Sequence, residues 1–145
     1  MEDLVETLTG RGIAIHTLVN NAGFGLRGSF ATLPYERQVA MIELNVTALT
    51  RLTYAVAPAF VGRGGGTIIN ISSAVAIGPE ILNGVYGGTK AFVLALGLSL
   101  HKELAGKNVR IQTVLPGATA TRFWAVAGGS LDQLPGEMVM RADDL

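Results

Sequence analysis

The sequence predicts an α/β fold built on a partial doubly wound parallel sheet, and three observations carry the prediction. Short apolar runs typical of strands alternate along the chain with longer segments of helical periodicity. Because a helix separates each strand from the next, the strands cannot form hairpins and should lie parallel. Apolar residues make up 49% of the chain and charged residues 15%, which suits a sheet with both faces covered. We expect residues 1–145 to form one partial domain.

The individual elements follow from local signals. Gly10 and Gly12 should end a short first helix. Pro34 suits the first turn of a long second helix, whose apolar residues recur at spacings of three and four. We expect helices over 3–8, 35–61 and 85–104, and strands over 13–19, 67–72 and 109–115. Beyond Pro116 the chain is punctuated by Gly and Pro, and no element is assigned there.

Composition excludes several classes of function. The formal net charge is zero and like charges do not cluster, which argues against a nucleic-acid partner. There is no cysteine, and His16 and His101 lack metal-ligand spacing. No apolar run is long enough for a membrane span, and the acidic start is unlike a signal peptide, so we expect a cytoplasmic protein.

Tyr86, Lys90 and Ser73 suggest proton-transfer chemistry. Tyr86 and Lys90 are four residues apart, so they share one face of the third helix. A nearby ammonium favours a phenolate, and we therefore expect Lys90 to lower the pKa of Tyr86. Ser73 follows the second strand, where its hydroxyl could hold a carbonyl or alcohol oxygen close to Tyr86.

Each motif alone also has a structural explanation. Tyr-x-x-x-Lys could be an exposed helix pair, Asn-Asn-Ala-Gly a turn that ends a strand, and Ser72-Ser73 a cap. His16 is expected to be a packed or edge residue. Phe123 and Trp124 could form an apolar substrate wall or serve hydrophobic packing.

The order and spacing of the motifs favour chemistry, because together they resemble the short-chain dehydrogenase/reductase family over about residues 10 to 123. The matching pieces are Asn20-Asn21-Ala22-Gly23, Leu44-Asn45-Val46, Ile69-Asn70-Ile71-Ser72-Ser73, Tyr86-Gly87-Gly88-Thr89-Lys90 and Pro116-Gly117. The resemblance implies a Rossmann-like fold, with the three expected strands corresponding to strands four, five and six of the family's seven.

The resemblance also implies roles for individual residues in an NAD(P)-dependent oxidoreductase acting on an alcohol or carbonyl. Tyr86 would be the general acid/base, Ser73 the substrate-orienting hydroxyl and Asn45 the anchor of a relay water. Lys90 would hold the nicotinamide ribose. The cofactor, NAD or NADP, would meet Asn21, Ala22, Gly23, Tyr86, Lys90, Pro116, Gly117, Thr119 and Thr121.

One family motif is missing from these 145 residues: the Gly-rich turn that binds the cofactor pyrophosphate. Gly23-Phe-Gly-Leu-Arg-Gly28 has a similar spacing, but it follows the Asn-Asn-Ala-Gly motif, and we interpret it as a loop. We therefore expect this chain by itself to bind NAD(P)H weakly. The alternative function is a non-catalytic fragment or interaction protein that keeps the site residues; a nucleotide-sensing module is a third possibility.

Partners are predicted from apolar surfaces. Ala74, Val75, Ile77, Ile81 and Leu82 lie near the expected site and favour an apolar small-molecule substrate. The family pairs its two long helices, here 35–61 and 85–104, with those of a second subunit. The latter helix is apolar on more than one face, which supports a homo-oligomer independently of the family.

Overall fold

A computed structural model describes residues 2–81 and 84–144 of the chain. Its main sheet has three parallel strands in the order β1 (Thr17–Asn20), β2 (Gly66–Ile71) and β3 (Val109–Val114). Helices α2 (Tyr35–Ile42) and α3 (Leu49–Gly62) connect β1 to β2, and α4 (Gly84–Leu104) connects β2 to β3. The α/β class and the parallel order predicted from the sequence are confirmed.

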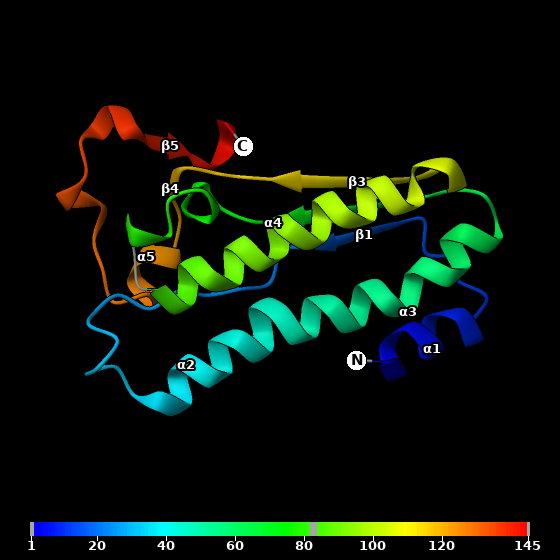
Figure 1. Ribbon diagram of the computed structural model, residues 1–145, viewed down its shortest axis with the longest axis horizontal. Coiled ribbons are helices and arrows are strands. Elements are labelled where there is room, and N and C mark those ends of the chain that lie inside the picture. The colour runs from blue at the N-terminus through cyan, green and yellow to red at the C-terminus, as the bar shows by residue number, and fades with distance from the viewer. Residues whose placement is uncertain (1, 82–83, 145) are drawn as a thin grey trace.

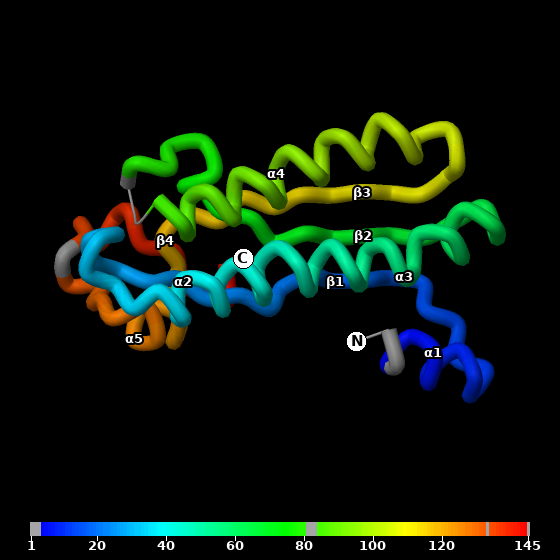
Figure 2. Tube along the Cα trace, turned by 60° about the horizontal axis from the view of Figure 1, so that its bottom comes forward, coloured from blue at the N-terminus to red at the C-terminus, as the bar shows by residue number. Residues whose placement is uncertain are grey.

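The connecting helices cover one face of this sheet (Figures 1 and 2). Val56 and Phe60 of α3 and Leu104 of α4 pack against Ile68, Val109 and Ile111 of the strands. Alternation along β3 matches this arrangement, since Val109 and Ile111 are buried while Arg110 and Gln112 are exposed. On the opposite face of the described sheet, Val19, Arg110 and Gln112 are exposed, as expected for a partial sheet.

The first strand and first helix differ in length from their predicted spans. The strand begins at Thr17 rather than at Ile13, because the ladder with β2 starts at the Thr17–Thr67 pair. Ile13 lies beyond that ladder and is exposed. In contrast, α1 runs over Glu2–Gly10 and includes the glycine expected to end it.

Two features of the fold lie outside the sequence predictions. The long helix over 35–61 is interrupted between α2 and α3 by a π-helical segment, Glu43–Ala48. A second, two-stranded parallel sheet joins β4 (Ala118–Ala120) to β5 (Val139–Arg141), with α5 (Phe123–Val126) and irregular turns between the strands. This second sheet holds the carboxyl-terminal segment beside the ends of the main strands (Figure 1).

Candidate active site

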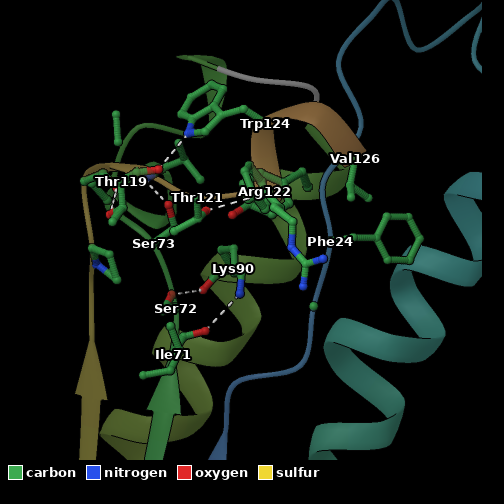
Figure 3. Close-up of a pocket in the computed structure, with 18 of the residues that line it drawn as sticks. Phe24, Ile71, Ser72, Ser73, Lys90, Thr119, Thr121, Arg122, Trp124 and Val126 are labelled. Carbon is green, nitrogen blue, oxygen red and sulfur yellow. Dashed lines mark hydrogen bonds between the residues drawn. The ribbon is translucent and has the colours of Figure 1, made fainter. Parts of the chain in front are cut away.

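A cavity of about 930 Å³ opens at the carboxyl ends of the three parallel strands. Its walls come from the loop after β1, the residues that follow β2 and β3, the start of α4, and α5 (Figure 3). In open parallel sheets this edge is where ligands bind. The fold thus brings together segments that are far apart in the sequence.

Tyr86 and Ser73 are hydrogen-bonded to each other at this cavity. Tyr86 lies in the first turn of α4, is 6% exposed, and has its ring centroid 5.5 Å from that of Phe123. Burial raises the pKa of Tyr86 above its usual 10.0, and the hydrogen bond with Ser73 partly offsets this rise. The Ser73 hydroxyl also accepts a hydrogen bond from the Val75 backbone, 3.3 Å away.

Lys90 lies one turn further along α4 and is 7% exposed. Its ammonium donates a hydrogen bond to the Ile71 carbonyl at 2.9 Å and lies 5.9 Å from the centroid of the Tyr86 ring. Burial lowers the pKa of Lys90 from 10.5 to about 8. Our expectation that Lys90 lowers the pKa of Tyr86 is not met in this structure, because burial of the phenol outweighs the other effects on it.

Asn45, in the π-helical segment, uses both N–H donors of its side-chain amide within the protein. Its amide nitrogen donates to the Phe24 carbonyl at 2.9 Å and to Thr89 Oγ1 at 3.1 Å, and its oxygen accepts from the Phe24 N–H at 3.1 Å. Asn45 is 2% exposed and does not line the cavity. Thr89 in turn donates to the Tyr86 carbonyl at 2.8 Å, so the Asn45 side chain ties the loop after β1 to α4.

Most residues expected to meet the cofactor do line the cavity: Asn21, Gly23, Tyr86, Lys90, Pro116, Gly117, Thr119 and Thr121. Ala22 does not line it. Pro116 is held in place by a 2.9 Å hydrogen bond from the Ala74 N–H to its carbonyl. Gly23 could not carry a side chain, because a Cβ there would lie 2.9 Å from Asn45 Oδ1.

The segment from 23 to 28 is the loop that we expected. It follows β1 directly, and the next helix, α2, begins only at Tyr35. Gly25 approaches the site so closely that a Cβ there would lie 2.7 Å from Phe123 Cζ and 3.2 Å from Tyr86 Cδ2. A glycine at this position therefore allows the loop to pack closely against Tyr86 and Phe123.

Phe123 and Trp124 serve hydrophobic packing, one of the two interpretations open for them, and they also form part of the cavity wall. They line the cavity, and their rings pack edge to face with centroids 5.8 Å apart. Trp124 also donates to the Thr119 carbonyl at 2.9 Å. Of the apolar residues near the site, Ala74 and Val75 line the cavity, Ile77 is 76% exposed, and Leu82 lies outside the described residues.

The structure gives Ser72 a specific role and adds four wall residues that the sequence did not single out. Ser72 is 3% exposed and donates to the Lys90 carbonyl at 2.7 Å, so it positions the helix that carries Lys90. Arg27, Arg122, Leu134 and Met138 also line the cavity. No signal in the sequence marks these four, because they reach the site only through the fold of the loop after β1 and of the carboxyl-terminal segment.

Neither a metal site nor a membrane span is found in the described part of the chain. No group of three His, Asp or Glu side chains within residues 2–81 and 84–144 could hold a metal ion. None of the helices in those ranges combines the length and the apolar character that crossing a membrane requires.

Comparisons of the sequence with known proteins point to one family. A short chain dehydrogenase family model matches residues 1–129. The serine 3-dehydrogenase of Rhizobium radiobacter is 39% identical over 116 residues, which are 79% of this chain and 46% of that protein. A probable NADP-dependent dehydrogenase of Haemophilus influenzae is 41% identical over 105 residues, or 72% of this chain and 42% of that protein. The chain therefore spans about half the length of these relatives.

Solved structures share the fold. A short-chain dehydrogenase from Sphingobium yanoikuyae in complex with NADPH superposes with a TM-score of 0.90 at 43% identity, covering 99% of this chain and 55% of that one. A bulky-bulky ketone specific alcohol dehydrogenase from Comamonas testosteroni superposes with a TM-score of 0.83 at 39% identity, covering 99% and 53%. Because the family model matches residues 1–129 of the 145 in this chain, the chain belongs to the short-chain dehydrogenase family.

Proposed function

We propose that the protein containing these residues is an NAD(P)-dependent oxidoreductase that interconverts an alcohol and a carbonyl compound. The observation that carries the proposal is the hydrogen-bonded pair of Ser73 and Tyr86 at the cavity, with Lys90 on the next turn of α4. The cofactor would supply or accept the hydride at the substrate carbon. The protein's own groups would then bind the substrate and move the proton.

The raised pKa of Tyr86 suits the role of an acid in carbonyl reduction. At neutral pH its phenol is protonated and can give its proton to the carbonyl oxygen as that oxygen becomes an alcohol. The Ser73 hydroxyl, already within hydrogen-bond reach of Tyr86, would hold the same oxygen. A positive charge on Lys90 would help to stabilise the resulting phenolate.

The residues around Lys90 fit the nicotinamide end of the cofactor. An ammonium has three donors, and in the described part of the chain Lys90 uses one, on Ile71, which leaves two for ribose hydroxyls. Asn21, Gly23, Pro116, Gly117, Thr119 and Thr121 would surround the nicotinamide and its ribose. The NADPH in the Sphingobium structure makes NADP(H) the first cofactor to test.

We propose a substrate with a largely apolar body, because Val75, Phe123, Trp124, Leu134 and Met138 form much of the wall. The names of the relatives span very different substrates, from serine to bulky ketones. The shared family therefore leaves the substrate open, and the wall residues are the better guide.

Replacing Tyr86 by Phe in the full-length protein tests the proposal. We expect kcat to fall by roughly a hundred- to ten-thousand-fold, because the proton donor is lost, while cofactor affinity changes little. Tyr35→Phe is the matched control, since Tyr35 is 74% exposed and does not line the cavity. A Tyr86→Phe enzyme with the parent kcat would refute the role of Tyr86. A parent protein that binds no cofactor would favour the alternative, a non-catalytic interaction protein.

We further propose that the protein forms a homo-oligomer through the long helices. Phe92 and Leu98 of α4 are 40% and 64% exposed, and Tyr54 of α3 is 76% exposed. Large apolar side chains in such positions on two neighbouring helices are consistent with a surface that a second copy covers.

A further inference from the structure

The charges around the cavity are of one sign. Arg27, Lys90 and Arg122 line it, and none of the described lining residues is Asp or Glu. The chain as a whole has eleven acidic and eleven basic residues, so this imbalance is local to the cavity. A cavity with three cations and no carboxylate favours an anionic ligand.

Arg27 is the cation that the fold holds on the α5 side of the cavity. Its backbone N–H donates to the Ala127 carbonyl at 2.9 Å, just after α5. Its side chain lies against Gly129, where a Cβ would be 2.5 Å from Arg27 Cδ and 2.7 Å from Nη1. A glycine at 129 therefore makes room for the guanidinium stem, and the residue is half-buried.

The Arg27 guanidinium has no acidic partner among residues 2–81 and 84–144. The ion pair found in those ranges joins Arg141 to Asp143, far along the chain. Arg27 is half-buried, and the planar donor set of a guanidinium matches a carboxylate. A ligand carboxylate would supply the missing partner.

Arg27 lines the same cavity as Tyr86 and Ser73. A Cβ on Gly25 would lie 3.2 Å from the Tyr86 ring, and Arg27 follows two residues later, at most about 7 Å along the backbone. Positions 23, 25 and 27 are alternate residues of the loop after β1. Gly23 and Gly25 have no side chain, so of these three only Arg27 has one that can contact a ligand. An oxygen at Tyr86 and an anion at Arg27 are thus compatible with one short molecule.

We propose that Arg27 binds a carboxylate of the substrate, so that the enzyme acts on oxo or hydroxy acids with an apolar middle section. The inference rests on the proposed function for the carbonyl end of the substrate. Arg122 is the less suitable anchor, because it is exposed and its side chain extends toward Lys90, on the side expected to meet the cofactor (Figure 3).

A kinetic comparison tests the proposal in the full-length enzyme. Levulinate, its longer oxo-acid homologues and their methyl esters keep the carbonyl and differ in charge. We expect the parent enzyme to prefer the acid that fits best over its ester, and Arg27→Gln to reduce that preference by roughly ten- to hundredfold in kcat/KM. Arg27→Lys should keep part of it, because the charge remains. Equal kcat/KM for acid and ester in the parent enzyme across the whole series would overturn the inference.

Arg122→Gln serves as the comparison variant. We expect it to change both members of a pair by the same factor, leaving the acid-to-ester ratio intact. If Arg122→Gln removes the preference and Arg27→Gln keeps it, the anchor is wrongly assigned and the proposal fails. Gly129→Ala keeps the guanidinium but should displace it, so it should also lower the acid-to-ester ratio; circular dichroism checks that each variant is folded.

A binding measurement separates this inference from the proposed function. Trp124 is the chain's one tryptophan and lines the cavity, so its fluorescence reports on the site. In the Tyr86→Phe enzyme the acid should change Trp124 fluorescence at lower concentration than the ester, and Arg27→Gln should abolish the difference. That result would support the anion site even if Tyr86 proved not to be the proton donor. Equal titrations of acid and ester with Arg27 intact would contradict the anion site, even if Tyr86→Phe had abolished turnover.

Discussion

Gly97 gives the sharpest test of how α4 packs on the sheet. A Cβ at this position would overlap Thr113 Oγ1 on β3, and it would lie 3.2 Å from Thr113 Cβ. Rotation of the threonine can move its hydroxyl but not its Cβ, and 3.2 Å is closer than the usual carbon–carbon contact of about 3.5–4.0 Å. Gly97→Ala should therefore force α4 and β3 apart.

Two opposing effects determine how much Gly97→Ala changes the free energy of unfolding. Overpacking costs about 1–3 kcal/mol, while alanine is better than glycine in a helix by about 1 kcal/mol. Gly88, on the same helix, is exposed, and a Cβ there would meet no atom within 4 Å, so Gly88→Ala should give the propensity gain alone. The difference in unfolding free energy between the two variants removes the propensity contribution and should be about 1–3 kcal/mol.

Urea denaturation followed by far-ultraviolet circular dichroism measures this difference. We expect Gly88→Ala to raise the midpoint and Gly97→Ala to lower it or leave it near the parent value, with equal slopes. In a Thr113→Ala background, Gly97→Ala should become stabilising, because its clash partner is gone. Equal stabilisation by Gly97→Ala and Gly88→Ala in the parent would refute the close packing of α4 on β3.

Two further predictions concern Lys90 and assembly. Burial lowers the pKa of Lys90 from 10.5 to about 8, so between these pH values the unfolded state binds more protons than the folded state. The unfolding free energy of the parent relative to Lys90→Met should therefore fall by roughly 3 kcal/mol as the pH drops from 10.5 to 8. Urea titration at each pH measures this difference. A difference that does not vary over this window would contradict the burial of the ammonium. Leu98 of α4 is 64% exposed, so Leu98→Lys should leave the stability of the full-length protein unchanged. In light scattering, this variant should have the mass of a monomer. A parent protein that is already monomeric would exclude the oligomer.

The gathering of Ser73, Tyr86 and Lys90 at the cavity was predictable because it depends on two simple geometric rules. Parallel strands end at one edge of a sheet, which brings Ser73 after β2 to the same side as the residues after β1 and β3. Spacing by four on a helix places Tyr86 and Lys90 on one face. Neither rule needs the details of packing, so the pattern of residues alone was sufficient.

The pKa of Tyr86 was not predictable in this way. The sequence reveals a charged neighbour, but it does not reveal how deeply the phenol is buried. In the structure, burial dominates and Lys90 is hydrogen-bonded to the Ile71 carbonyl. The direction of the shift therefore depended on the tertiary environment rather than on the spacing of two residues.

The second sheet escaped prediction for a different reason. Strands of three residues, such as β4 and β5, are too short to show an alternating pattern. They pair across an intervening segment of turns and a single-turn helix, α5. The same limitation hid Leu134 and Met138, which reach the cavity only because this segment folds back on the main sheet.

The loop after β1 links the parts of the site that the sequence motifs treat separately. Gly23 packs against Asn45 and lies near Lys90, Gly25 packs against Tyr86 and Phe123, and Arg27 bonds to Ala127 after α5. The hydrogen bonds from Asn45 to Phe24 fix this loop at its start. A shift of the loop would therefore move the surroundings of Lys90, of the tyrosine and of α5 together. The π-helical segment that carries Asn45 thus has a physical role without lining the cavity: it fixes the loop that packs against Tyr86, the proposed proton donor, and that carries Arg27, the proposed substrate anchor.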